Sequence, residues 1–223
     1  MTARRLWLIG TALAAVAVFA LMWLGYAQQW VWLTNLDAAA LAPAYRFGSA
    51  HPVWVTAWDV YCTALGPTVF RVAGLVVIVV LLIRRHRRTA LFLVVTVEFS
   101  GLLTQLVKEI ADRSRPGTAM VTALSTSFPS GHAVGVMICV LAFLTVGLPL
   151  LRPSWRGWAI ALGVVVIVTI GAGRVVLNVH HPSDVIAGWA LGYAYFVACR
   201  LLVAPVSALT PAGETPEALG TAR

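Results

Sequence analysis

Six long apolar runs constrain the fold of this chain more than any other feature of its sequence. Each approaches the length of about 20 residues that an α-helix needs to cross a bilayer. Charged residues make up only 11% of the 223 residues, less than half of the roughly 25% that is typical of soluble domains. We therefore predict an all-α integral membrane protein with one six-helix domain over residues 1–204. The predicted spans are about residues 6–24, 67–83, 89–107, 132–151, 158–173 and 183–204.

The two ends of the chain need separate interpretations. Arg4 and Arg5 precede the first run, so a cleaved signal peptide is the competing interpretation of that run. We favour a retained helix, because the run is longer than the roughly 7–15 residues of a signal-peptide core. Residues 205–223 contain much Pro, Gly, Thr and Ala, and we predict that they form a disordered cytoplasmic tail.

Clusters of basic residues predict the orientation in the membrane. In a six-span protein they all fall on one side, which the positive-inside rule makes cytoplasmic. Both termini are then cytoplasmic, and the segments 26–66, 108–131 and 174–182 lie outside. This topology accounts for the net charge of +8, so we expect no nucleic-acid partner. The clusters are Arg4 with Arg5, the basic run 84–88, Arg152 with Arg156, and Arg200.

The first outer segment is rich in tryptophan. Trp30, Trp32, Trp54 and Trp58 all lie within it, and Trp at this density is typical of a membrane–water interface. We interpret residues 28–60 as short helices on the outer surface. They either guide a lipid or form a loop that is only anchored by its aromatic rings.

The three cysteines do not indicate a metal site. Cys62, Cys139 and Cys199 are odd in number and far apart, and no Cys-x-x-Cys or Cys/His zinc spacing is present. We expect them to be free thiols that pack as small apolar side chains.

Polar residues gather in three short patches at the outer ends of spans. They read KEIADRSRP at 108–116, PSGH at 129–132 and GRVVLNVHHPSD at 173–184. Ionisable groups at a membrane edge are costly and are candidates for function. Lys108, Arg115 and Arg174 supply three cations on one side, which suits a phosphate group. The alternative is that these cations contact lipid headgroups.

The PSGH patch predicts the start of a helix that can bind an anion. Ser130 can cap the helix, and Gly131 lets the backbone approach a ligand closely. The free N–H groups and the dipole of this helix N-terminus favour an anion, and His132 lies on its first turn. The alternative is an ordinary helix start with an incidental histidine.

The third patch supplies two histidines and a carboxylate. His181 precedes Pro182, which suits the first position of the sixth helix, and Asp184 lies in the first turn. A carboxylate on one imidazole nitrogen leaves the other nitrogen as a nucleophile or base. The alternative for Asp184 is a simple helix cap, and both His180 and His181 remain candidates for the nucleophile.

Together the three patches predict phosphoryl transfer, in which one histidine attacks phosphorus and another protonates the departing oxygen.

These residues resemble the type 2 phosphatidic acid phosphatase superfamily, which includes lipid phosphate phosphatases and vanadium haloperoxidases. The pattern of that family is Lys, six residues, Arg-Pro; then Pro-Ser-Gly-His; then Ser-Arg, five residues, His, three residues, Asp. The same order and spacing occur within residues 108–184, except that Gly173 stands where the family has Ser. We expect Gly173 to lose a hydroxyl contact to phosphate. The matching residues are Lys108, Arg115, Pro116, Pro129 to His132, Arg174, His180 and Asp184.

The resemblance implies a role for each residue. His180 would be the nucleophile, Asp184 would orient it, and His132 would protonate the leaving group. The phosphate would bind to Lys108, Arg115 and Arg174, with Ser130 and Gly131. The family needs no metal, so we expect no cofactor.

The implied function is a membrane phosphatase that hydrolyses a lipid phosphate or diphosphate on the outer face of the cell membrane. Undecaprenyl or polyprenyl diphosphate is the first candidate substrate. Phosphatidate, diacylglycerol diphosphate and phosphatidylglycerophosphate are the alternatives. The expected partners are this lipid and the bilayer.

Two other classes of function compete with this one. An anion transporter should keep polar groups near the midplane of several spans, whereas these groups collect at one edge. A metal-dependent hydrolase would use His132, His180, His181 and Asp184 as ligands, which leaves the three cations unexplained.

One ionisable pair lies outside the motifs. Arg71 and Glu98 are at similar depths in the second and third predicted spans. We expect them to pair between neighbouring helices, and the alternative is that Glu98 lines a lipid-facing cavity.

Overall fold

The computed structural model describes residues 2–205, so the predicted tail from residue 206 onward lies outside the described part. Within residues 2–205 all regular secondary structure is helical, as predicted. The helices are α1 (Ala3–Ala27), α2 (Val31–Ala50), α3 (Pro52–Ala64), α4 (Pro67–Ile83), α5 (Arg87–Leu93), α6 (Ser100–Ala111), α7 (Gly131–Gly147), α8 (Pro153–Val176) and α9 (Pro182–Leu202), with a π-helical turn η1 (Val94–Glu98) and a 3-10 turn η2 (Leu148–Leu150).

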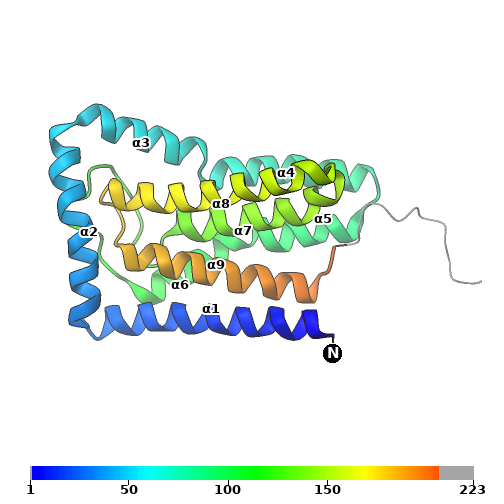
Figure 1. Ribbon diagram of the computed structural model, residues 1–223, viewed down its shortest axis with the longest axis horizontal. Coiled ribbons are helices and arrows are strands. Elements are labelled where there is room, and N and C mark those ends of the chain that lie inside the picture. Colours follow the sequence, from blue (N-terminus) through cyan, green and yellow to red (C-terminus); the bar gives the residue numbers. More distant parts are fainter. Residues whose placement is uncertain (1, 206–223) are drawn as a thin grey trace, which may run out of the picture.

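Six helical segments of the described chain are long and apolar enough to cross a membrane, which is the number expected from the sequence. Their common direction gives the bundle in Figure 1. These properties are those of a multi-pass membrane protein. The segments are Ala3–Ala27, Pro52–Ile83, Arg87–Ala111, Gly131–Leu150, Pro153–Val176 and Pro182–Leu202.

The first predicted outer segment differs in part from the expectation of surface helices. Helix α2 crosses one end of the bundle, but α3 runs beside α8 and leads into α4 (Figure 1). Val55, Trp58 and Cys62 lie on one face of α3 and pack in a cluster with Ile170 and Leu177. Burial of this apolar face explains why α3 joins the bundle and does not lie across its end.

The third predicted span is not one regular α-helix. It changes at η1, where the Phe99 N–H donates to the Val94 carbonyl five residues back. Beside this turn, Arg71 Nη2 donates to Ser100 Oγ at 3.3 Å. Arg71 Nε and one carboxylate oxygen of Glu98 are buried without hydrogen-bond partners. Within residues 2–205 no direct ion pair joins Arg71 and Glu98, but the charge of Arg71 still acts on Glu98.

The three cysteines are free and buried, as predicted. Cys62 packs in the cluster shared with α3 and α8, and Cys139 and Cys199 belong to the larger core between α4, α7 and α9.

Close packing between α7 and α9 brings their first turns together. A Cβ atom at Gly188 would lie 2.7 Å from Ala133 Cβ and 2.9 Å from the Ser130 carbonyl oxygen. The backbone N–H of Ser130 donates to the Asp184 carbonyl at 3.0 Å. Because only glycine permits this approach, residue 188 helps to join the PSGH turn to the start of α9.

Candidate active site

The residues of the three motifs lie at one end of the bundle, the end that α2 crosses. In Figure 1 the ends of α6 and α8 and the starts of α7 and α9 meet there. Lys108 is in the last turn of α6, and Arg174 is in the last turn of α8. Helix α7 begins at Gly131 after the cap Ser130, and α9 begins at Pro182 after the cap His181, as the sequence predicts. Residues that are far apart in the sequence therefore share one site.

The imidazole of His180 lies between a carboxylate and a guanidinium. Its Nδ1 is 3.6 Å from Asp184 Oδ2, and its Nε2 is 3.1 Å from Arg115 Nη1. An arginine can only donate, so this contact suits an Nε2 that carries a free lone pair. Only 2% of His180 is exposed, and burial lowers its pKa to about 4, although Asp184 acts in the opposite direction. His180 is therefore neutral at pH 7 and presents Nε2 toward Arg115.

His181 also contacts Asp184. Its backbone N–H donates to Asp184 Oδ2 at 2.8 Å, and its Nδ1 is 3.2 Å from the same oxygen. This contact forms the capping box of α9. Distance to the carboxylate alone does not separate the two histidines, but only His180 turns its second nitrogen toward Arg115.

Asp184 has two further partners that sequence reasoning missed. Ser127 Oγ donates to Asp184 Oδ2 at 2.5 Å, and Arg113 Nη1 donates to Oδ1 at 2.6 Å. Ser127 is 3.5 Å from His180 Nδ1. The position of Ser127 just before the PSGH motif, and of Arg113 just before Arg115, were the available signals.

Arg113 links Asp184 to the transverse helix α2. Its Nη2 donates to Asp37 Oδ2 at 2.8 Å, and its guanidinium lies 4.6 Å above the ring of Tyr26. Asp37 also accepts from the backbone N–H of Ser183 at 2.9 Å and from its hydroxyl at 2.7 Å. Arg113, Asp37 and Asp184 are 7%, 3% and 0% exposed, so the charges of this network are nearly removed from solvent. Nothing in the local sequence around Asp37 indicates this contact.

The three predicted phosphate-binding cations lie close enough to act on one another near His180. Lys108 Nζ donates to the Thr126 carbonyl. Arg115 donates to the carbonyls of Ser125 and Val179, and both of these bonds are 2.7 Å long. Arg174 Nε is buried without a hydrogen-bond partner. Burial and the nearby charge of Arg174 lower the pKa of Arg115. The cations therefore repel one another at this place, and a bound anion would offset the free-energy cost of that repulsion.

The PSGH turn contributes a capped helix start. Ser130 Oγ accepts from the Ala133 N–H at 3.5 Å. His132 follows on the first turn, within electrostatic reach of Arg174 and His180. A Cβ at Gly131 would come 3.6 Å from Lys108 Cε, so the start of α7 and the end of α6 are adjacent.

The structure explains the glycine at position 173. A Cβ there would lie 2.6 Å from Cys62 Sγ and 2.8 Å from Trp58 Cε3. Such distances force neighbouring atoms to move. The side chains of α3 therefore fill the space that a serine would need, and the Cys62 thiol contacts Arg174.

In residues 2–205, no group of three or more His, Cys, Asp and Glu side chains is placed so that it could hold a metal ion.

Comparison with known proteins shows similarity to several phosphatases. The chain is 39% identical over 112 residues to a lipid A 1-phosphatase of Rhizobium etli. The aligned region covers 45% of this chain and 44% of that protein. The chain is 37% identical over 99 residues to phosphatidylglycerophosphatase B of Bacillus subtilis, covering 43% and 48%. It is 33% identical over 119 residues to an undecaprenyl-diphosphatase of Sulfolobus acidocaldarius, covering 50% and 54%. The matches thus span about half the length of these relatives.

A solved structure and a family model extend the comparison. The crystal structure of the first transmembrane PAP2 type phosphatidylglycerolphosphate phosphatase, from Bacillus subtilis, superposes with a TM-score of 0.72 at 24% identity. The superposition covers 86% of this chain and 95% of that one, so the two share a fold. The model of the PAP2 superfamily matches residues 89–206, which is more than half of the chain. On this match, the protein belongs to the PAP2 superfamily.

Proposed function

We propose that the protein is a membrane lipid phosphatase in which His180 attacks the phosphorus of a lipid phosphate or diphosphate. The observation that carries this proposal is the placement of the His180 ring. Its Nδ1 faces Asp184, its Nε2 faces Arg115, and the charge of Lys108 also acts on the ring. A neutral imidazole whose far nitrogen meets a carboxylate is a competent nucleophile.

In the first step, His180 Nε2 forms a bond to phosphorus while the bond to the leaving oxygen breaks. Lys108, Arg115 and Arg174 hold the equatorial oxygens, together with Ser130 and the N–H groups at Gly131. His132, on the first turn of α7, gives its proton to the departing oxygen. Asp184 stabilises the imidazolium as positive charge develops on His180.

In the second step, water attacks phosphorus and the P–N bond breaks, so that inorganic phosphate and free His180 are released. His132 now takes the proton of the water and returns to its starting state. Each cycle consumes one water and yields one inorganic phosphate, together with the lipid alcohol from a monophosphate or the lipid monophosphate from a diphosphate. The chain's own residues supply both proton transfers, and the proposal requires no metal.

The substrate class follows from the position of the site and from the relatives. The three relatives are named for lipid A, phosphatidylglycerophosphate and undecaprenyl diphosphate. In each, a phosphate group terminates a membrane lipid. Undecaprenyl or polyprenyl diphosphate is our first candidate, with phosphatidate, diacylglycerol diphosphate, phosphatidylglycerophosphate and the 1-phosphate of lipid A as alternatives.

The orientation of the site is part of the proposal. The arginines at the start of α1, at the junction of α4 and α5, and at the end of α9 lie at the end of the bundle away from α2 (Figure 1). The positive-inside rule places that end in the cytoplasm. The site then faces the outside of the cell membrane, and both ends of the six-helix domain are cytoplasmic.

The experiment is phosphate release from purified protein in detergent across the lipid panel above. His180→Ala should abolish release from every substrate, and activity above about 10% of wild type would refute the nucleophile. His181→Ala is the matched comparison, because this neighbouring histidine also contacts Asp184. Substantial activity in His181→Ala and none in His180→Ala is the expected pattern. Loss with EDTA that a divalent ion restores would favour a metal-dependent hydrolase instead.

A further inference from the structure

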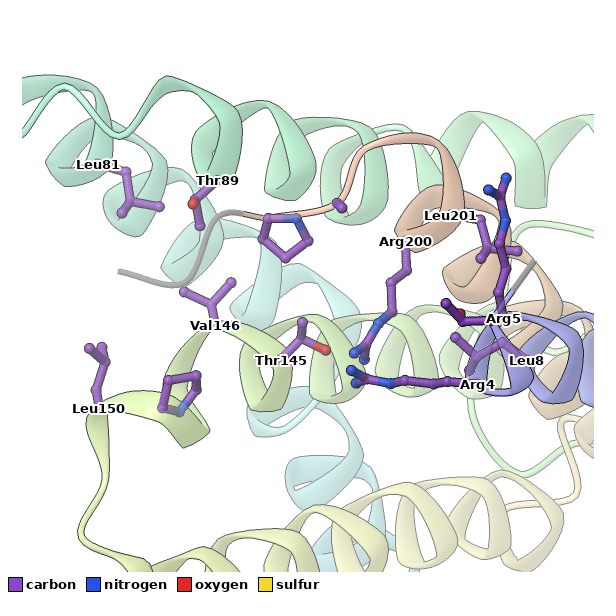
Figure 2. A pocket seen from close by; sticks show the side chains of 14 residues that line it. Arg4, Arg5, Leu8, Leu81, Thr89, Thr145, Val146, Leu150, Arg200 and Leu201 are labelled. Carbon is purple, nitrogen blue, oxygen red and sulfur yellow. The ribbon is translucent and has the colours of Figure 1, made fainter. Parts of the chain in front are cut away.

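A second cavity lies at the end of the bundle opposite the motifs. Its volume is about 560 Å³. It opens between the start of α1 and the end of α9, and its other walls come from the ends of α4 and α7, the start of α5 and the turn η2 (Figure 2). None of the residues proposed for phosphate hydrolysis lines it, so it is separate from the candidate active site.

Two arginines converge at the mouth of this cavity. Figure 2 shows the guanidinium groups of Arg4, from α1, and Arg200, from α9, directed toward each other. The charge of Arg4 acts on Arg200, which is half-buried. Within residues 2–205, neither side chain forms an ion pair, and no Asp or Glu lines the cavity. Two like charges held together without a carboxylate leave a place for an external anion.

The cavity walls specify the chemistry of that anion. The hydroxyl of Thr145, beside Arg200 in Figure 2, donates to the Leu141 carbonyl. Arg5 also lines the cavity, but Figure 2 shows its guanidinium directed away from those of Arg4 and Arg200, so these two guanidinium groups are the donors that converge. Arginine presents paired N–H groups that match phosphate oxygens. The remaining wall is largely apolar, with Leu8, Leu81 and Leu201 among its side chains. A phosphate joined to an acyl chain satisfies both parts.

We propose that this cavity binds the phosphodiester of an anionic phospholipid, which bridges Arg4 and Arg200. Basic pockets between transmembrane helices suit lipid headgroups of this charge. The bound lipid clamps the start of α1 to the end of α9, two helices that pack along their lengths. It stabilises the bundle without entering the site of hydrolysis, since a phosphodiester is not the substrate of the proposed reaction.

Thermal unfolding in a neutral detergent tests the proposal. Dihexanoyl phosphatidylglycerol, dihexanoyl phosphatidylcholine and inorganic phosphate are titrated separately, with vanadate present to block the candidate active site. Only phosphatidylglycerol should raise Tm with a saturable dependence. In the double variant R4Q/R200Q, the concentration of phosphatidylglycerol that gives half of the Tm increase should rise by about tenfold or more, as expected for loss of charge-assisted hydrogen bonds.

The double variant R84Q/R88Q is the matched control, because these exposed arginines lie at the same end but outside the cavity. It should keep the wild-type response, and R4Q/R200Q should keep its phosphate release within about twofold. An equal loss in both double variants, or an equal response to phosphatidylcholine, would overturn the proposal. An equal response to inorganic phosphate would reduce the cavity to an ion site and also overturn the lipid assignment.

The acidic residues Glu214 and Glu217, beyond the described part of the chain, are the competing source of negative charge. If E214Q/E217Q lowers Tm without added lipid as much as R4Q/R200Q does, the tail is the occupant and the lipid proposal fails.

Discussion

Replacement of Asp37 by Asn tests whether the transverse helix α2 positions the candidate catalytic carboxylate. Asp37 Oδ2 accepts from Arg113 and the Ser183 hydroxyl, and its Oδ1 accepts from the Ser183 N–H. An Asn amide has one oxygen and one NH2 group. In either orientation the NH2 group faces a donor, so one side of the network loses its bonds.

The magnitude follows from the burial of these contacts. Hydrogen bonds to charged groups contribute about 1.5–3 kcal/mol each, and removing one partner of a buried ion pair costs about 3–5 kcal/mol. Asn keeps the shape of the side chain and one acceptor. We therefore expect the free energy of unfolding to fall by about 2–4 kcal/mol, with a Tm lower by about 5–10 °C.

The effect on catalysis should be smaller and confined to kcat. Arg113 then loses its second carboxylate and holds Asp184 less firmly, but Asp184 retains its bonds from Ser127 and the His181 N–H. We expect kcat to fall about tenfold, which corresponds to about 1.4 kcal/mol. KM should change little, because Lys108 and Arg174 are not part of this network.

The assay is phosphate release with full kcat and KM determination, alongside thermal unfolding in the same detergent. Asp112→Asn is the matched control, since Asp112 is exposed and lies one residue from Arg113. Its left-handed backbone, with φ of 40°, also tolerates Asn well. If Asp37→Asn matches Asp112→Asn in both Tm and kcat, the network does not position Asp184 and the reasoning is wrong.

Three further predictions concern Gly173 and His180. Gly173→Ser should lower the free energy of unfolding by about 1–3 kcal/mol, measured by thermal unfolding, because a Cβ at this position would lie 2.6 Å from Cys62 Sγ. The double variant G173S/C62A should recover part of this loss. An unchanged Tm in the single variant would contradict this packing. Burial lowers the pKa of His180 from 6.5 to about 4, so its contribution to stability is complete above pH 6.5 and is lost as pH falls toward 4, by up to roughly 3 kcal/mol. His180→Gln should remove this part of the pH dependence of Tm. An identical pH profile of Tm in wild type and variant would show that titration of His180 does not contribute to stability. Activity of the wild type should decline as pH falls through about 4, where the proposed nucleophile becomes protonated.

Local features of the fold could be predicted because their causes are local. Long apolar runs indicate membrane-spanning helices wherever they occur. The starts of α7 and α9 follow from Ser130 as a cap and from Pro182 at a first helical position. The capping contact of Asp184 spans only three residues. The motif residues also form one set by spacing, although their roles remain part of the proposed function.

Contacts between distant segments had no such signal. Asp37 is 76 residues from Arg113 and 146 from Ser183, and only the packing of α2 across the bundle brings them together. Gly173 suggested a missing hydroxyl contact, whereas the fold shows that Trp58 and Cys62 occupy its space. Arg71 and Glu98 had suitable depths and interact electrostatically, yet the side-chain hydrogen bond of Arg71 goes to Ser100.

The sequence by itself therefore determined the helical membrane class, the helix starts and the set of motif residues, because periodicity, capping and spacing act over short stretches of chain. The tertiary structure decided which buried charges meet, how α3 fills the space beside Arg174, and which nitrogen of His180 faces Arg115. These depend on the rotation and depth of whole helices, which follow from packing of the entire bundle.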